Sequence, residues 1–315
     1  MTAEELRLTR SSPVVRRIAA EHHLDIAGIP GTGIGGRVTK QDILGHLESH
    51  PAADTHAAQA DGTPATQQPP PTTPPPPAPA VPSARVGRVE VVPMSPIRRK
   101  TAEHMVLSKR TSAHVSTVFE IDMTRVDQLR QKHRQAFETR GVKLTYMPFV
   151  LKAVVEALKV FPVLNASIEG DSIVYHRDLN VGVAVALDWG LIVPVVHHAD
   201  EKNVLGLARA VNDLAERARA RRLKVEEVQG GTFTITNPGV FGSLFGTPII
   251  NQPQAAILGI GTIEKRPVVR DDAIAIRTMA YFALTFDHRL VDGADADRFL
   301  AHLKQTLQEF DEAAL

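Results

Sequence analysis

The segment ALTFDHRLVDGADADRFL, residues 283–300, places a histidine and an aspartate where side chains with chemical roles are often found. A strand pattern ends at Phe286, His288 and Asp292 follow four positions apart, and Gly293 releases the backbone before a helical pattern begins. A strand and a helix that meet in this way hold side chains at an open edge, where an imidazole can act as a general base. Both residues could equally be surface turn residues, and the spacing alone leaves the two interpretations open.

The composition excludes several kinds of chemistry. The 315 residues include no cysteine, so disulfides, thiolate metal ligands and a protein thiol nucleophile are excluded, and any sulfur chemistry must come from a ligand. The formal net charge of +1 gives no reason to expect nucleic acid as the main partner. The longest apolar stretch, residues 181–196, is interrupted by a charge and a proline and predicts no membrane span. We expect no metal site, because the histidines show no metal-binding spacing, and a reducing, cytoplasmic location without a signal peptide.

A glycine-rich loop within residues 31–44, GTGIGGRVTKQDIL, has the spacing G-x-G-x-x-G of a dinucleotide-binding turn. That fingerprint must follow a strand and open a helix. Here a Ser-Pro start at residues 12–13 predicts one short helix before the loop, and a capping box at residues 39–42 predicts another after it. The context therefore argues against NAD binding. It favours a tight loop between two helices, with Asp25 accepting hydrogen bonds from the loop amides.

The composition changes sharply along the chain. Residues 51–84 are rich in proline and almost free of large apolar side chains, which predicts an extended linker, with a proline-rich ligand for another protein as the alternative. The predicted organisation is a tail (1–10), a small module (11–48), the linker (49–87) and a large domain (88–315).

The large domain alternates helical and strand patterns, which favours an α/β two-layer domain with a mixed sheet. Thr124 is the expected cap of the second helix, and Gly141 is its expected terminator. The expected helices cover residues 95–109, 124–139, 147–160, 203–220 and 294–310, and the expected strands cover 116–123, a hairpin over 181–196, 232–237, 255–261 and a strand ending at 286.

The small module, SPVVRRIAAEHHLDIAGIPGTGIGGRVTKQDIL (12–44), resembles the peripheral subunit-binding domain of the dihydrolipoyl acyltransferases. The resemblance implies a small all-α domain that binds dihydrolipoamide dehydrogenase or a 2-oxo acid decarboxylase through basic side chains. Arg16, Arg17 and Arg37 match those basic positions, while a further one is Ala20 here, which implies a smaller basic patch. An ordinary solvated charged face is the alternative.

The large domain resembles the catalytic domain of the same acyltransferases. FDHRLVDGADADRFL matches their H-x-x-x-D-G signature, and residues 93–124 and 230–261 match the start of that domain and its glycine-rich strand region. The resemblance implies a chloramphenicol-acetyltransferase-like fold and the transfer of an acyl group between dihydrolipoamide and coenzyme A.

The resemblance also implies a role for each site residue. A free thiol has a pKa of about 8.5, so the His288 imidazole would take the proton of coenzyme A during direct attack on the acyl-lipoamide carbonyl. The Thr236 hydroxyl would stabilise the oxyanion, although a threonine chosen only for its strand propensity is the alternative. Asp292 would orient the active-site loop.

The family's assembly leads to further expectations. Its active site lies between the subunits of a trimer, and its trimers build a core of 24 or 60 subunits. No lipoyl domain is recognised here, so we expect the lipoyl group from a missing N-terminal domain or from another chain. Thr236 favours a succinyl group, with branched-chain and acetyl groups as alternatives. A non-catalytic core and docking scaffold, or a lipoyl-independent acetyltransferase, are the competing functions.

Overall fold

The computed structural model describes residues 15, 18–19, 29, 32, 38–49 and 88–315. The chain divides into two compact units, residues 1–84 and 85–315. The predicted subunit-binding arginines Arg16, Arg17 and Arg37 lie outside the described residues, as do Asp25 and the predicted linker beyond Ser49. The predicted domain limits stay predictions.

The first unit contains helix α3 (Lys40–Ser49), which begins at the expected capping box. The Thr39 backbone N–H donates to Asp42 Oδ2 at 2.8 Å, and the Asp42 N–H donates to Thr39 Oγ1 at 3.3 Å. The same carboxylate accepts hydrogen bonds from the backbone N–H of Thr32 at 3.0 Å and from its hydroxyl at 2.7 Å. These bonds, that of the Thr32 backbone foremost, hold the pKa of Asp42 well below its ordinary value. Asp42 therefore ties α3 to the glycine-rich loop.

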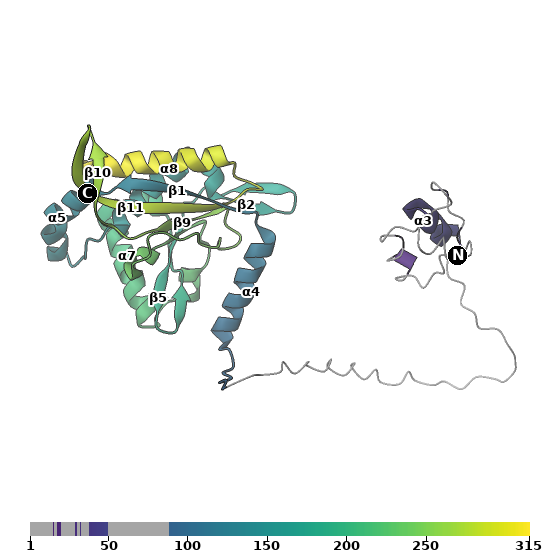
Figure 1. Ribbon diagram of the computed structural model, residues 1–315. Coiled ribbons are helices and arrows are strands. Elements are labelled where there is room, and N and C mark those ends of the chain that lie inside the picture. Colours follow the sequence, from purple (N-terminus) through teal and green to yellow (C-terminus); the bar gives the residue numbers. More distant parts are fainter. Residues whose placement is uncertain (1–14, 16–17, 20–28, 30–31, 33–37, 50–87) are drawn as a thin grey trace. The chain divides into compact units, whose positions relative to one another are not determined.

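The second unit is built on a mixed sheet with the strand order β1-β11-β9-β8-β4-β7, and β10 pairs with the free half of β11 (Figure 1). The β8–β9 and β4–β8 pairs are parallel, and the other pairs are antiparallel. The bounds are β1 His114–Asp122, β4 Val181–Val183, β7 Val195–Val196, β8 Phe233–Thr236, β9 Ala256–Ile260, β10 Glu264–Arg270 and β11 Ala273–Asp287, with two separate hairpins, β2 Ala166–Glu169 with β3 Ser172–Tyr175 and β5 Val185–Leu187 with β6 Gly190–Ile192.

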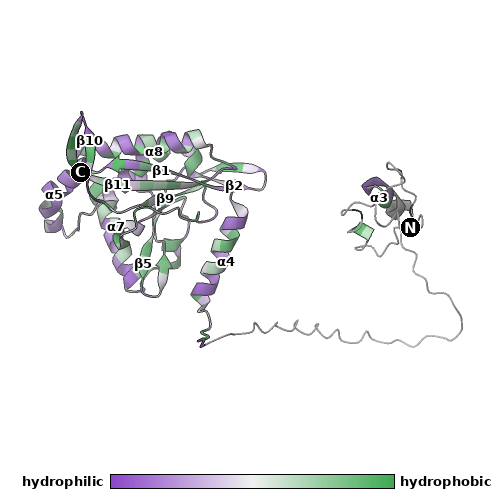
Figure 2. Cartoon of the chain, viewed as in Figure 1, coloured by the Kyte–Doolittle hydropathy of each residue, from purple (hydrophilic) through white to green (hydrophobic). Residues whose placement is uncertain are grey.

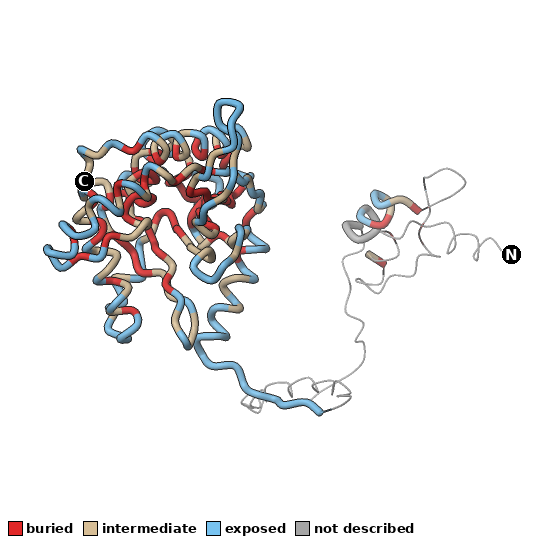
Figure 3. The backbone as a smooth tube through the Cα atoms, turned by 60° about the vertical axis from the view of Figure 1, so that its left-hand side comes forward, coloured by how far each residue is buried: buried red, intermediate tan, exposed pale blue. Residues whose placement is uncertain are grey.

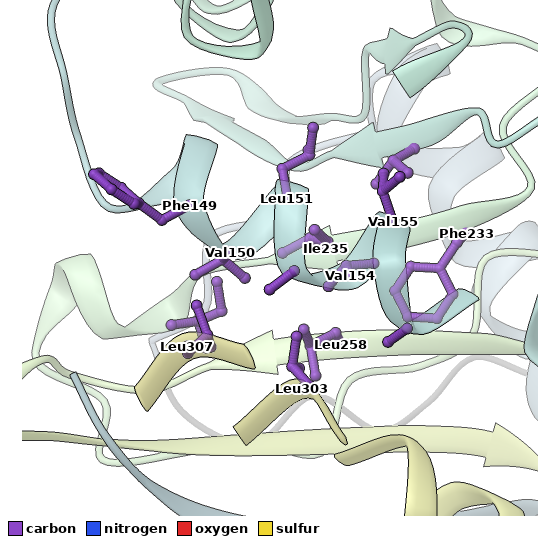
Figure 4. Close-up of a cluster of buried hydrophobic side chains, with 14 of the residues drawn as sticks. Phe149, Val150, Leu151, Val154, Val155, Phe233, Ile235, Leu258, Leu303 and Leu307 are labelled. Atoms are coloured by element: carbon purple, nitrogen blue, oxygen red, sulfur yellow. The ribbon is translucent and has the colours of Figure 1, made fainter. Parts of the chain in front are cut away.

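Five α-helices accompany this sheet within residues 88–315. They are α4 Pro96–Thr111, α5 Thr124–Thr139, α6 Met147–Val160, α7 Val204–Arg219 and α8 Gly293–Gln308. The side chains of α6 interlock with those of β8, β9 and α8 in the core (Figure 4). Because apolar residues repeat around most of α6, most of its side chains are buried. Buried segments gather in the interior of the second unit, and exposed segments lie on its outside (Figure 3). The predicted α/β two-layer class with a mixed sheet is confirmed.

The segment after β8 passes close to the backbone of β9. A Cβ atom added to Gly259 would lie 3.2 Å from the Gly246 carbonyl oxygen, and one added to Gly261 would overlap the carbonyl oxygen of Leu244. Only glycine fits at position 261, and a side chain at position 259 would push the segment away, so the two glycines let the chain that leaves Thr236 lie close to β9.

Helix α5 differs from expectation at its first turn. Thr124 is not its cap: Met123 occupies that position without a side-chain cap, and the Thr124 hydroxyl accepts a hydrogen bond from the Thr278 N–H at 3.0 Å. Asp122 Oδ1 accepts from the Thr124 N–H at 2.9 Å instead. Gly141 follows the helix with φ +71°, which confirms it as the terminator.

The expected hairpin over residues 181–196 forms, but in two parts. Its outer part is the β5–β6 pair, while β4 and β7 join the main sheet. The chain divides at Ala184, whose N–H donates to the Ile235 carbonyl oxygen of β8 at 2.9 Å. The pairs β2–β3 and β10–β11 were not predicted, because their short or exposed strands lack a clear alternation of apolar residues.

We expect Leu151→Ala in α6 to lower the free energy of unfolding by about 2–5 kcal/mol, because Leu151 is fully buried and the truncation leaves a cavity. Val160→Ala, at the exposed end of the same helix, should change it by less than about 0.5 kcal/mol. Urea denaturation at one fixed protein concentration measures both. Equal, small effects would contradict the assigned core.

Candidate active site

His288 follows directly on the last residue of β11. Its backbone N–H donates to the Ala113 carbonyl oxygen at 2.9 Å, which extends the β1–β11 pairing by one step. The side chain is exposed, and its ring lies 5.6 Å from the Phe286 ring between centroids. The strand therefore delivers an accessible imidazole at the edge of the sheet, as the sequence predicts.

Asp287, which the sequence analysis did not single out, fastens this turn. Its buried carboxylate accepts hydrogen bonds from the Ala113 N–H and the Arg289 N–H, both at 3.1 Å, and from the Arg289 guanidinium at 2.7–3.1 Å. Burial raises the pKa of Asp287, but the bonds from Arg289, Ser112 and Ala113 outweigh it and lower the pKa. The sequence holds a signal for this ion pair, because an acidic and a basic residue flank the histidine in the D-H-R triplet at 287–289.

A second polar network joins the end of α4 and the start of β1 to residues 250–252. The Ser108 hydroxyl donates to the Ile250 carbonyl oxygen at 2.6 Å, and Gln252 Nε2 donates to Ser112 Oγ at 2.7 Å. The His114 ring accepts from the Ile250 N–H at Nε2 and lies 3.1 Å from the Ser112 carbonyl oxygen at Nδ1. This pattern requires the neutral imidazole with its proton on Nδ1.

Asp292 occupies the N-cap position of α8, with extended backbone and an exposed side chain that makes no capping bond. Among the described residues its carboxylate has no hydrogen-bond partner, whereas its carbonyl oxygen accepts from the N–H groups of Asp295 and Ala296 at 3.1 Å. The contacts that hold the turn after β11 come from Asp287, and an orienting role for Asp292 stays a prediction.

Thr236 ends β8 and is half-buried beside a cavity of about 460 Å³. The cavity walls are mostly apolar and come from β4, β5, α7 and the segment after Thr236. The apolar lining residues include Val183, Val185, Leu191, Val211, Val240 and Phe241. A hydroxyl beside an apolar cavity can donate a hydrogen bond to an oxyanion that water cannot reach freely.

A single chain does not bring Thr236 and His288 together. Thr236 is level with Gly259 of β9, and Gly259 is level with Ala283 of β11. His288 lies five residues further along β11, so about 17 Å separates the two positions along the strands. Because β11 runs antiparallel to β8 and β9, the two residues follow strand ends on opposite sides of one sheet, which are called its opposite edges here.

The described part of the chain offers neither a metal site nor a membrane-spanning helix. No group of three or more histidine, aspartate and glutamate side chains in that part of the chain could hold a metal ion. Within the same residues, no helix combines the length and apolar character needed to cross a membrane.

We expect Asp287→Asn to lower the free energy of unfolding at neutral pH by about 1–3 kcal/mol, because it removes charge-assisted hydrogen bonds from a buried site. The folded-state pKa of Asp287 is lowered, so its contribution is complete above the ordinary aspartate pKa of about 3.9 and is lost as the pH falls further. Denaturation of both proteins at neutral and acidic pH measures the difference, with the exposed turn variant Asp271→Asn as control. A pH-independent difference would contradict the ion pair.

The chain is similar to known proteins over almost its whole length. The model of the 2-oxoacid dehydrogenases acyltransferase (catalytic domain) family matches residues 86–315, and that of the e3 binding domain matches residues 9–44. The chain is 41% identical over 307 residues to the dihydrolipoyllysine-residue succinyltransferase component of the 2-oxoglutarate dehydrogenase complex of Escherichia coli K12, covering 97% of this chain and 72% of that protein. It is 39% identical over 318 residues to the branched-chain lipoamide acyltransferase component of Bacillus subtilis, covering 98% and 73%.

Solved structures agree with these relatives. A probable dihydrolipoamide acetyltransferase from Listeria monocytogenes superposes with a TM-score of 0.69 at 40% identity, covering 71% of this chain and 96% of that one. An Azotobacter vinelandii dihydrolipoamide acetyltransferase, studied for a serine, a histidine and an asparagine in its catalytic mechanism, gives 0.70 at 35% identity, covering 74% and 96%. The chain thus combines an e3 binding domain with an acyltransferase catalytic domain, and it belongs to the acyltransferase family of the 2-oxoacid dehydrogenase complexes.

Proposed function

We propose that this chain transfers an acyl group between dihydrolipoyl-lysine and coenzyme A in the oligomeric core of a 2-oxo acid dehydrogenase complex. The observation that carries the proposal is a spacing. His288 follows Thr236 by 52 residues and precedes Asp292 by four, and the serine, histidine and asparagine studied in the Azotobacter enzyme have the same separations. Here Thr236 replaces the serine and Asp292 the asparagine, and both replacements keep a hydrogen-bonding group.

The proposed mechanism needs no covalent acyl-enzyme. The His288 imidazole accepts the thiol proton of coenzyme A while the sulfur attacks the carbonyl carbon of the acyl-lipoyl thioester. The Thr236 hydroxyl donates a hydrogen bond to the resulting oxyanion. When the intermediate collapses, the carbon–sulfur bond to the lipoyl group breaks, and the histidinium returns its proton to the leaving thiolate. The products are acyl-coenzyme A and dihydrolipoyl-lysine.

This mechanism requires two chains, because Thr236 and His288 occupy opposite edges of one sheet. We place His288 of one subunit against Thr236 of its neighbour in a trimer, with trimers assembled into a core of 24 or 60 subunits. Exposed apolar surface supports self-association: Val92 on the arm before α4 is 72% exposed and Phe241 is 76% exposed. Helix α4 also carries hydrophobic residues (Figure 2), of which Ile97, Val106 and Leu107 are exposed. One related solved structure is the cubic core of a pyruvate dehydrogenase complex.

Partners and acyl group follow from the relatives. The e3 binding domain supports docking of dihydrolipoamide dehydrogenase, with a decarboxylase as the alternative, through Arg16, Arg17 and Arg37. We propose a lipoyl group supplied by another domain or chain, and a cytoplasmic location. A succinyl group is favoured by Thr236 and by the Escherichia coli relative, but the relatives also include acetyl and branched-chain enzymes. A scaffold without turnover is the competing function.

The activity is tested with purified protein, free dihydrolipoamide and a panel of succinyl-, acetyl- and branched-chain acyl-coenzyme A. We expect His288→Ala to lower kcat by about 10²–10⁴ and Thr236→Ala by about 10²–10³, because each removes a group that acts in the transition state. His302→Ala on α8 is the matched control and should retain activity. An assembled wild-type particle that transfers no acyl group from any donor would favour the scaffold.

The shared site is tested by mixing. Co-expressed His288→Ala and Thr236→Ala chains should form mixed trimers in which about a quarter of the sites pair an intact histidine with an intact threonine. Activity should therefore rise far above that of either variant alone. If the mixture stays as inactive as its parts although mass spectrometry shows mixed trimers, the two residues do not work together across a subunit boundary.

A further inference from the structure

Three cavities with shared lining residues follow one another along the β5–β6 hairpin from Thr236 to the hairpin tip, and together they are called the cleft here. The cavity of about 460 Å³ at Thr236 shares Ala186 and Arg219 with a second cavity of about 440 Å³. The second shares Trp189 and Arg221 with a third of about 340 Å³. The β5–β6 hairpin and α7, which form the walls, lie side by side (Figure 1). A ligand arm entering at the tip can therefore follow the hairpin to Thr236.

The two ends of the cleft differ in chemistry. Apolar side chains surround the inner end, which suits an uncharged hydrocarbon arm rather than a charged one. Trp189, Arg219 and Arg221 form the outer end and are called the arginine–tryptophan rim here. Asp188 is the one acidic side chain among the described residues that line the three cavities. The rim is therefore cationic and aromatic.

The nearby acids do not neutralise the rim. Arg217 engages both Asp213 and Glu227, at 2.6 Å each. Arg219 and Arg221 are exposed and form no ion pair with any residue in the described part of the chain. Positive charge at the mouth of the cleft is thus left to interact with a partner.

The conformation of Arg221 supports a role beyond helix termination. It has φ +56° in the left-handed position after α7, where glycine is the usual residue. Its guanidinium lies 5.3 Å from the centre of the Trp189 ring. A strained residue that carries a cation onto an aromatic surface at the mouth of a cleft is a candidate for binding.

We propose that the arginine–tryptophan rim docks an acidic protein domain that bears dihydrolipoyl-lysine or its acyl thioester, whose arm then follows the apolar cleft to Thr236. This inference rests on the proposed function, because it assigns the lipoyl side of the reaction to this cleft. A protein partner fits better than a small anion, because the exposed cations continue along the surface through Arg222 and Lys224. Electrostatic attraction would align the carrier before its arm enters.

The test compares two acceptors in the full chain. In Arg219→Gln/Arg221→Gly, kcat/KM should fall about tenfold or more with a lipoylated acidic domain as acceptor, mostly through KM and less at high salt. Because Arg219 also lines the Thr236 cavity, the free substrate is compared with Arg221→Gly alone, which should change kcat/KM for free dihydrolipoamide by less than about twofold. The glycine preserves the left-handed backbone, so the melting temperature should not fall on its account. Arg209→Gln, an exposed arginine of α7 without an ion pair among the described residues, is the matched control.

Binding of the carrier domain can be measured independently of acyl transfer by fluorescence. Trp189 is the single tryptophan of the chain, so its fluorescence reports on the rim when a tryptophan-free lipoylated domain is titrated in. We expect saturable quenching that the double variant weakens about tenfold and that Arg209→Gln leaves unchanged. If the wild type transfers no acyl group at all, the proposed function fails, and this titration still decides the docking.

Three results would overturn the docking surface. The first is identical titration curves for wild type and double variant. The second is an equal loss of kcat/KM with free dihydrolipoamide and with the carrier domain, which would place the arginines in the chemistry. The third is a selective rise in KM for coenzyme A, which would assign them to its phosphates.

Discussion

The direction of β11 relative to β8 and β9 is the constraint on which the rest depends. Because β11 is antiparallel to β9, His288, which follows β11, lies at the side of the sheet where β8 and β9 begin. Thr236 lies at the opposite side, where β8 ends. No loop rearrangement within one subunit can exchange these edges without breaking a ladder of hydrogen bonds in the core. The proposed reaction, which uses both side chains, therefore needs groups from two chains, and that proposal makes assembly part of catalysis.

The two edges are held by different means. At the His288 edge a buried, multiply bonded carboxylate joins the turn to the end of α4, so charge-assisted hydrogen bonds set the backbone position of the imidazole. At the Thr236 edge, Gly259 and Gly261 allow the following segment to lie directly on β9. One edge is fixed by polar bonds and the other by close packing. The His288 side chain stays exposed, which is compatible with the proposed role as a base that acts on a neighbouring subunit.

The cleft beside Thr236 illustrates how the fold separates binding from chemistry. The β5–β6 hairpin leaves the main sheet after Ala184, whose N–H still donates to Ile235 of β8, and the cleft is lined by the hairpin and α7. The apolar inner end suits the reacting arm, and the cationic outer end suits a carrier. In the proposed arrangement, the two needs are met at different points of one hairpin. A substitution at Arg221, which does not line the Thr236 cavity, would change docking without altering the groups near the thioester.

The sequence by itself determined whatever depends on local order. The bounds of α6 and α7, the capping box at Thr39, the terminator Gly141 and the position of His288 all follow from periodicity, capping and turn chemistry within a few residues. Tertiary structure decided the rest. The Thr124 hydroxyl accepts a hydrogen bond from a strand residue 154 positions away, and the Asp287 carboxylate accepts one from Ala113, 174 positions away. The hairpin over residues 181–196 divides between two sheets. Tertiary structure also decided that Thr236 and His288 lie apart, because strand order and direction depend on which distant segments pair, and a local pattern carries no record of that choice.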